Sequence, residues 1–130
     1  MKSNIIWFLI TAVLGLAAII IPAMFLDYYR YYDEFSFYNV YALGIEKFSF
    51  WSGIFLVFSG GISAFLNGGN AFKWGLATMI TYPFITIVDA DKGASSHNLF
   101  PMDMIFCIPF LFFIGSVGAL GGLLIKKINK

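Results

Sequence analysis

The sequence predicts an all-α, polytopic membrane protein built as a single domain over residues 1–130. Three observations predict this fold class: the composition, four long apolar runs, and the placement of the acidic residues. Hydrophobic residues make up 60% of the chain, charged residues make up 12%, and the mean hydropathy is +0.84. Soluble domains average about 45–50% apolar and about 25% charged residues. A chain of this length has too little interior to bury so much apolar surface away from water.

Four apolar runs predict a four-transmembrane-helix bundle. The runs cover residues 5–26, 48–66, 72–88 and 104–125, which is 22, 19, 17 and 22 residues. A helix needs roughly 17–25 residues to cross a hydrocarbon core of about 30 Å, so each run is long enough to span. The first run is expected to be a retained span, because the apolar region of a signal peptide is only about 7–15 residues long.

The charged residues predict the orientation. All seven acidic residues lie in the two segments that join the first run to the second and the third to the fourth. Five of the eight basic residues lie near the termini or at the start of the third run. Because Lys and Arg favour the cytoplasmic side, we expect both the N- and C-termini to be cytoplasmic. The seven lysines against one arginine indicate an AT-rich genome and favour a bacterial plasma (inner) membrane.

Small residues in the second and fourth runs predict close helix packing. In lipid, helices associate through close contacts that small side chains permit. Members of the set that are three or four residues apart share one helix face. We therefore expect the second and fourth spans to pack together near their cytoplasmic ends, with a homodimer contact as the open alternative. The set consists of Ser59, Gly60, Ser63, Gly115, Gly118 and Gly122.

Prolines predict bends in the outer parts of the spans. Pro22, Pro83 and Pro109 each lack the N–H that would bond the carbonyl four residues earlier. Helices packed closely at the inner end and bent at the outer end would open an outward-facing cavity. No Asp, Glu, Lys, Arg or His lies in the middle of a run. This argues against an ion-coupled transporter, since such proteins usually hold their ion with an intramembrane carboxylate or histidine.

The outer segment between the third and fourth runs carries the candidate binding residues. Carboxylate and amide oxygens suit Ca²⁺ or Mg²⁺, and an imidazole shifts the preference towards Zn²⁺ or Mn²⁺. A divalent cation is therefore a possible cofactor, although none is certain, and a solvated loop with a helix cap is the alternative interpretation. The candidate residues are Asp89, Asp91, His97, Asn98 and Asp103, of which Asp89, Asp91 and His97 are the candidate metal ligands.

The outer segment between the first and second runs is rich in tyrosine. Tyr28, Tyr31, Tyr32 and Phe35 follow helical spacing and would form one aromatic face. Such a face is typical of a lid or of a partner interface, because rigid aromatic rings with polar tips make good contact surfaces. Anchoring among lipid headgroups is the alternative interpretation.

These residues favour a non-enzymatic membrane protein whose extracytoplasmic face binds a cation, a small ligand or a partner protein. A channel or facilitator for a small solute is the alternative, and a metal-dependent outer-face enzyme is less favoured. The chain has one histidine, His97, and one cysteine, Cys107, and no convincing catalytic constellation. The lipid bilayer is an expected partner, together with a membrane protein or a second copy of the chain. No basic patch points to nucleic acid.

Overall fold

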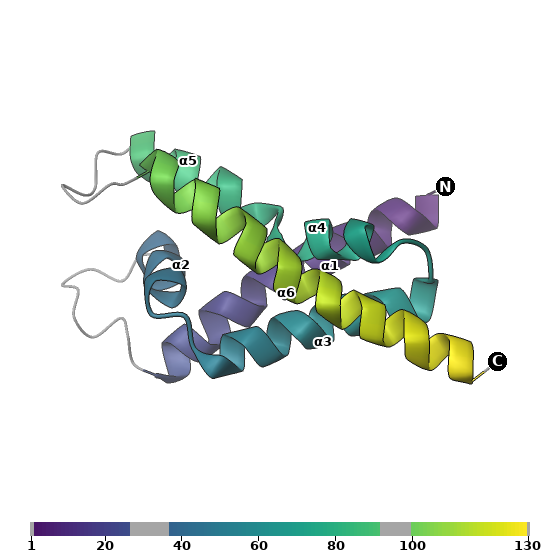
Figure 1. Ribbon diagram of the computed structural model, residues 1–130. Coiled ribbons are helices and arrows are strands. Elements are labelled where there is room, and N and C mark those ends of the chain that lie inside the picture. Colours follow the sequence, from purple (N-terminus) through teal and green to yellow (C-terminus); the bar gives the residue numbers. More distant parts are fainter. Residues whose placement is uncertain (1, 27–36, 92–99, 130) are drawn as a thin grey trace.

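The computed structural model describes residues 2–26, 37–91 and 100–129, and every regular element within these ranges is an α-helix (Figure 1). The predicted all-α class is thus confirmed for the described part of the chain. The six helices are α1 (Lys2–Phe25), α2 (Phe37–Glu46), α3 (Phe50–Asn67), α4 (Ala71–Met79), α5 (Thr81–Asp91) and α6 (Phe100–Ile128).

Three of these helices contain a stretch long and apolar enough to cross a membrane. The stretches are Asn4–Phe25, Phe50–Asn67 and Ile105–Ile128. Their apolar side chains are largely turned outwards: Leu9 and Val13 on α1 are 59% and 62% exposed. Apolar surface on this scale is typical of a protein embedded in lipid, where hydrocarbon covers it. The three helices therefore indicate a membrane-embedded, multi-pass protein.

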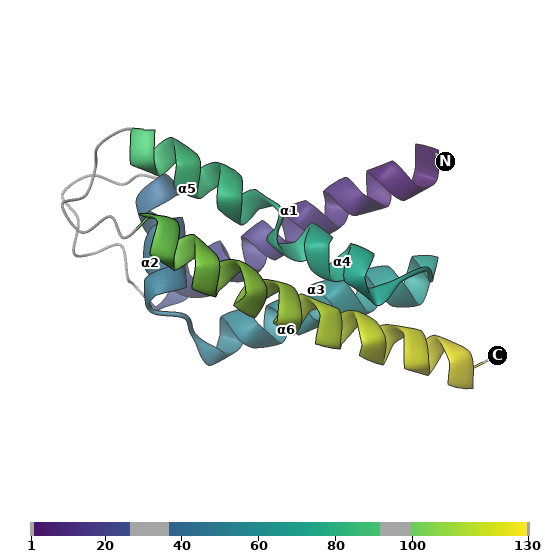
Figure 2. The ribbon, with the colours of Figure 1, turned by 45° about the horizontal axis from the view of Figure 1, so that its top comes forward.

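The segment predicted as the third span is divided into two helices that meet at Ile80. The helices α4 and α5 have 9 and 11 residues. At 1.5 Å per residue they reach about 14 and about 17 Å, so neither crosses a core of about 30 Å alone. Pro83 has no N–H to donate to the carbonyl of Met79, and this gap falls at the break. Figure 2 shows α5 turning away from the direction of α4. Two helices thus replace the continuous one predicted over 72–88.

The described helices form a crossed bundle with two distinct ends (Figure 1). Both chain termini and the connection between α3 and α4 lie at one end, which we call the terminal end. The helix α2, the end of α5 and the start of α6 lie at the opposite end, which we call the loop end. The long helix α6 runs diagonally across α3 and α4 between these two ends.

Glycines let α6 cross α3 at backbone distance, and the two form the most extensive helix pair of the described chain. A side chain on Gly60 would collide with the backbone carbonyl of Gly115, and one on Gly118 would collide with that of Val57. This contact is the kind that small residues permit between helices in lipid.

Two other members of the small-residue set differ in their surroundings. Nearer the terminal end, Gly122 lies against the backbone carbonyl of Gly61 and so extends the contact between α3 and α6. The hydroxyl of Ser59 instead donates a hydrogen bond of 2.7 Å to the carbonyl of Phe55 within its own helix. A buried hydroxyl is satisfied in this way without a neighbouring helix.

The turn between α3 and α4 closes the terminal end. Gly68 and Gly69 have φ angles of 69° and 88°, a region that glycine adopts at little cost. The indole N–H of Trp74 donates to the carbonyl of Gly68 at 2.7 Å. The ammonium of Lys126 donates to the carbonyl of Leu66 at 3.1 Å, which places a cation at the negative end of α3. The first bond ties α4 to the turn, and the second ties α6 to the end of α3.

Candidate functional site

Both candidate segments of the sequence join helices at the loop end. The tyrosine-rich segment joins α1 to α2, and the segment with the Asp and His residues joins α5 to α6. All four helix ends lie at this end of the bundle, with the ends of α5 and α6 on one side of α2 and the end of α1 on the other (Figure 1). Six of the predicted residues fall between these helices and lie outside the described residues: Tyr28, Tyr31, Tyr32, Phe35, His97 and Asn98.

The other three predicted ligands belong to helices whose backbone is described. Asp89 and Asp91 stand in the last turn of α5, and Asp103 stands in the first turn of α6. The helices α5 and α6 contact one another and lie side by side in both ribbon views (Figures 1 and 2). Three carboxylate positions, two on α5 and one on α6, therefore share one end of two neighbouring helices.

The helix termini give these positions unequal electrostatic surroundings. The C-terminus of a helix carries a partial negative charge, which disfavours a nearby carboxylate by typically 0.3–1 kcal/mol, and the N-terminus favours one. Asp103 therefore occupies a position where the helix terminus stabilises a negative charge, whereas Asp89 and Asp91 occupy positions where it destabilises one. No basic residue occupies the last turn of α5 to offset them. A positive charge brought to this end of α5 would be stabilised.

The helix α2 occupies the space between α1 and α5 at the loop end (Figure 1). Val40 and Tyr41 are buried there, with 1% and 3% of their surface exposed. Gly44 lies so close to α1 that a side-chain atom on it would approach a methyl group of Ile19 to 2.8 Å. The outward-facing space expected from the prolines is therefore filled in part by α2, which the sequence pattern did not predict at this position.

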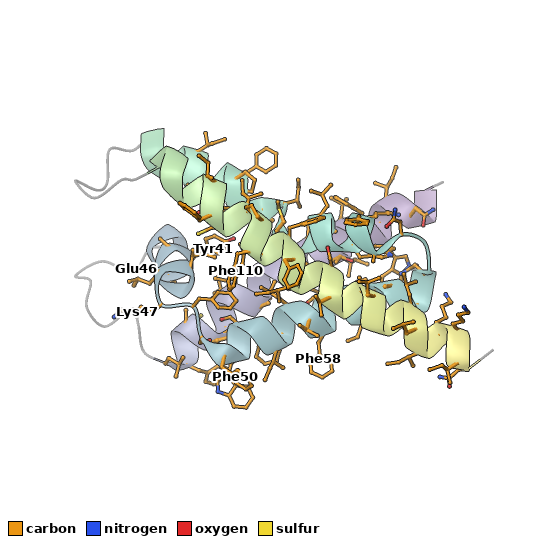
Figure 3. All side chains as sticks on the ribbon, viewed as in Figure 1. Tyr41, Glu46, Lys47, Phe50, Phe58 and Phe110 are labelled. Atoms are coloured by element: carbon orange, nitrogen blue, oxygen red, sulfur yellow. The ribbon has the colours of Figure 1, made fainter. Side chains whose placement is uncertain are left out.

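The phenol of Tyr41 is a polar group that α2 brings into the bundle (Figure 3). Its ring lies 6.4 Å from that of Tyr82 on α5, at an interplanar angle of 39°. Burial raises the pKa of the Tyr41 phenol well above its ordinary value, and the neighbouring Thr81 hydroxyl offsets only part of that rise. The group is therefore protonated at physiological pH and able to donate a hydrogen bond.

The sequence carried a weak signal for this part of the site. The aromatic spacing predicted a helix over residues 28–35, which lie outside the described residues, and the described helix α2 follows them at Phe37–Glu46. Val40, Leu43 and Gly44 have the spacing of one helix face, and that face is the one buried against α1. The pattern is only about one turn long, which is too short to predict a helix from sequence.

Buried hydroxyls lie deeper in the bundle. The hydroxyl oxygens of Thr11 on α1 and Ser63 on α3 are 2.7 Å apart in a hydrogen bond, and both residues are fully buried. Ser63 thus bonds to α1. The hydroxyl of Thr78 on α4 donates to the carbonyl of Gly75 at 2.8 Å. These bonds are satisfied inside the protein, as the absence of water in a bilayer core requires.

A further buried hydroxyl, that of Ser116, makes no hydrogen bond within the described part of the chain, whereas that of Thr81 lies beside the phenol of Tyr41. Ser116 on α6 lies against Gly75 on α4, and Thr81 begins α5 directly after the break at Ile80. An unsatisfied buried polar group costs about 1–3 kcal/mol. Buried hydroxyls close to a broken helix are the places where a small polar molecule within the bundle would find hydrogen bonds.

The described side chains include no group of three or more His, Cys, Asp or Glu residues that could hold a metal ion. Cys107 on α6 is a free, half-buried thiol. Comparison of the chain with protein-family models, with curated proteins and with solved structures finds no match.

Proposed function

We propose that the chain is a non-enzymatic, multi-pass membrane protein whose loop end faces the outside and binds a divalent cation between the end of α5 and the start of α6. The observation that carries this proposal is the pair Asp89 and Asp91 in the last turn of α5, beside the first turn of α6 that carries Asp103. A bound cation would relieve the unfavourable position of the two carboxylates and join them to the third.

The adjoining segment supplies further ligands for this site. His97 and Asn98 belong to the segment of eight residues that joins α5 to α6 in sequence. They are therefore at most seven residues from either helix. Oxygen ligands alone favour Ca²⁺ or Mg²⁺, and the imidazole of His97 would favour Zn²⁺ or Mn²⁺. The identity of the stabilising cation therefore reports whether His97 takes part.

The tyrosine-rich segment is proposed as a lid over this end or as a surface for a partner membrane protein. Both of its ends are attached to packed helices, since α1 precedes it and α2 is buried against α1. Replacing Tyr28, Tyr31 and Tyr32 together by alanine is expected to abolish any complex formed through this surface. A parent protein that purifies without a partner or second copy, in a gentle detergent, would argue for the lid.

The orientation proposed is that of a bacterial plasma membrane protein with both termini in the cytoplasm. It rests on the lysines near the terminal end, such as Lys73 and Lys126. A fluorescent protein fused to either terminus is expected to fluoresce, and alkaline phosphatase fused to either is expected to be inactive. The reverse pattern at both termini would move the loop end, and its site, to the cytoplasmic side.

The cation site is tested by thermal melting of the detergent-purified protein in EDTA and then with Ca²⁺, Mg²⁺, Mn²⁺ and Zn²⁺ in turn. A ligand at about 100 times its Kd that binds only the folded state adds about 2.7 kcal/mol of stability. The shift should vanish when Asp89 and Asp91 are both changed to Asn. The matched control is Glu46→Gln, which removes an exposed carboxylate at the end of α2. An equal shift in all three proteins would contradict the site.

A facilitator for a small neutral solute is the second candidate, favoured by the unpaired hydroxyl of Ser116 against α4 and by the hydroxyl of Thr81 beside the break at Ile80. Discontinuous helices with exposed polar groups form the binding sites of many transporters. Liposomes containing the protein should then shrink and re-swell faster than empty ones in hyperosmotic glycerol or urea. Ser116→Val should slow this flux, whereas Ser59→Ala, which removes a hydroxyl satisfied within its own helix, should not.

A further inference from the structure

We infer that the groove between the first half of α3 and the middle of α6 holds one acyl chain of a phospholipid from the leaflet at the loop end. The groove has a volume of about 560 Å³ and is lined by Phe48, Ser49, Phe50, Gly53, Ile54, Val57, Phe58 and Ile114. Its lining is apolar apart from Ser49 and opens on the outer surface of two candidate spans. This inference rests on the membrane-embedded character of those spans and is independent of the cation site.

The depth of the groove matches one leaflet of a bilayer. Its lining extends along α3 from Phe50 to Phe58, which is about 12 Å at 1.5 Å per residue. Half of a hydrocarbon core of about 30 Å is about 15 Å. Because α3 begins at the loop end, the groove runs from that surface towards the bilayer centre, as an acyl chain does.

Exposed aromatic side chains form the outer side of the groove. Phe50 and Phe58 are 80% and 60% exposed, and Figure 3 shows both projecting away from α3 on its outer side. On the inner side, Phe48 packs edge-on against Phe110 of α6, with ring centroids 5.1 Å apart. The pair of exposed rings would hold hydrocarbon against the helix, whereas a flat helix surface would leave it free to exchange.

Gly53 keeps the middle of the groove open. Helix packing does not require a glycine there, because a side-chain atom on Gly53 would meet only the ring of Phe48, at an ordinary 3.6 Å. Gly60 and Gly118, by contrast, lie where any side chain would strike a backbone carbonyl. Glycine destabilises a helix interior relative to alanine, so its presence at this position is explained by the space it leaves.

The chemistry at the mouth of the groove fits a phosphate headgroup. Lys47 and Ser49 lie between the end of α2 and the start of α3 in sequence, and Figure 3 shows Lys47 at the loop end. The ammonium of Lys47 supplies positive charge, and the hydroxyls of Ser49 and Ser52 lie 3.0 Å apart beside it in sequence. An apolar groove below a cationic, hydroxyl-bearing mouth is complementary to a phospholipid, whose acyl chain is joined through glycerol to a phosphate.

The test is native mass spectrometry of the full-length protein, delipidated in detergent and titrated with dioleoyl phosphatidylcholine. The parent should bind one lipid more tightly than any further ones. Gly53→Leu fills the groove and should weaken that first binding about tenfold, a change of about 1.4 kcal/mol. Gly121→Leu is the matched control, because Gly121 on α6 has open space around it outside the groove, and it should bind as the parent does.

Two further measurements keep the outcome decisive. Gly53→Ala tests the same position with a side-chain atom that fits, so a smaller loss of binding should follow even if the leucine variant folds poorly. Oleyl alcohol, which has the chain but no phosphate, should bind more weakly than the phospholipid, and Lys47→Gln should remove that difference. Equal binding by the parent and both Gly53 variants, or a parent that is dimeric and a Gly53→Leu variant that is monomeric, would overturn the inference.

Discussion

The hydroxyl oxygens of Thr11 on α1 and Ser63 on α3 lie 2.7 Å apart, at positions with 0% exposure, and their hydrogen bond joins two candidate spans. Thr11 is also bonded to the carbonyl of Trp7 at 2.7 Å. The Thr11 hydroxyl is the donor in both contacts, to the Trp7 carbonyl and to the Ser63 hydroxyl oxygen, so its one proton is shared between two acceptors. The contact between the two buried hydroxyls joins α1 to α3 and so favours one rotation of the two helices against each other.

This bond predicts coupled effects of mutation. Thr11→Val and Ser63→Ala should each lower the free energy of unfolding, and the double variant should lose less than the sum of the two. Interhelical hydrogen bonds of this kind in membrane proteins average about 0.6 kcal/mol and reach about 1.7 kcal/mol. A double-mutant cycle from reversible unfolding in mixed micelles measures the coupling, and strictly additive losses would show that the bond does not stabilise the pair.

The crossing of α3 and α6 predicts opposite responses at two glycines of one helix. Gly118→Ala would press a methyl group into the carbonyl of Val57, and overpacking of this kind costs typically about 1–3 kcal/mol. Gly121→Ala meets nothing within 4 Å and should be neutral or stabilise α6 by up to about 1 kcal/mol. The midpoints of denaturant unfolding in one detergent compare the two variants. Similar destabilisation by both would contradict the close crossing.

The unpaired hydroxyl of Ser116 predicts a substitution that does not destabilise. Ser116→Ala removes a buried polar atom that has no hydrogen bond within the described residues, so stability should stay equal or rise by about 1 kcal/mol. A loss of more than about 1 kcal/mol in melting experiments would instead indicate that the hydroxyl has a partner in the native membrane.

The buried phenol of Tyr41 predicts a loss of stability at alkaline pH. The folded state holds its pKa above the ordinary value of about 10, so the unfolded chain releases this proton first. The stabilisation is complete below about pH 10 and falls above it, by at most about 1.4 kcal/mol per pH unit, until the folded pKa is reached. The Tyr41→Phe variant has no phenol at this position and so lacks this pH-dependent contribution to stability. Between pH 8 and pH 11 the free energy of unfolding of the parent should therefore fall relative to that of Tyr41→Phe. A difference between the two proteins that stays constant over this range would contradict a buried phenol.

The sequence predicted the helical class and the membrane character because both depend on local properties: run length, apolar content and the scarcity of charge. It did not predict the division at Ile80, because the apolar run continues through residues 72–88 without interruption. Pro83 was the available signal, but a proline bends some membrane helices and divides others, according to how neighbouring helices satisfy the freed carbonyl.

Contacts between helices were less predictable. Spacing shows which small residues share a face but not which neighbour that face meets. Ser63 has the same helical spacing as the glycines, and yet its hydroxyl bonds Thr11 on α1. Gly15 is the one glycine of the first apolar run, so no spacing marked it as a packing residue. A side chain there would nevertheless strike the carbonyl of Thr78 on α4. At the candidate site, the sequence identified the residue types. Only the fold shows that the end of α5 and the start of α6 lie at the same end of the bundle.

A cation site at the end of α5 and the start of α6 is tested most directly by isothermal titration calorimetry of the purified, EDTA-treated protein with Ca²⁺, Mg²⁺, Mn²⁺ and Zn²⁺. The proposal predicts one saturable site for one of these cations, lost in the Asp89→Asn, Asp91→Asn double variant and kept in Glu46→Gln. If Zn²⁺ or Mn²⁺ is the cation, His97→Ala should weaken binding as well. Heats of dilution alone for all four cations, in a parent protein that melts cooperatively, would contradict the site.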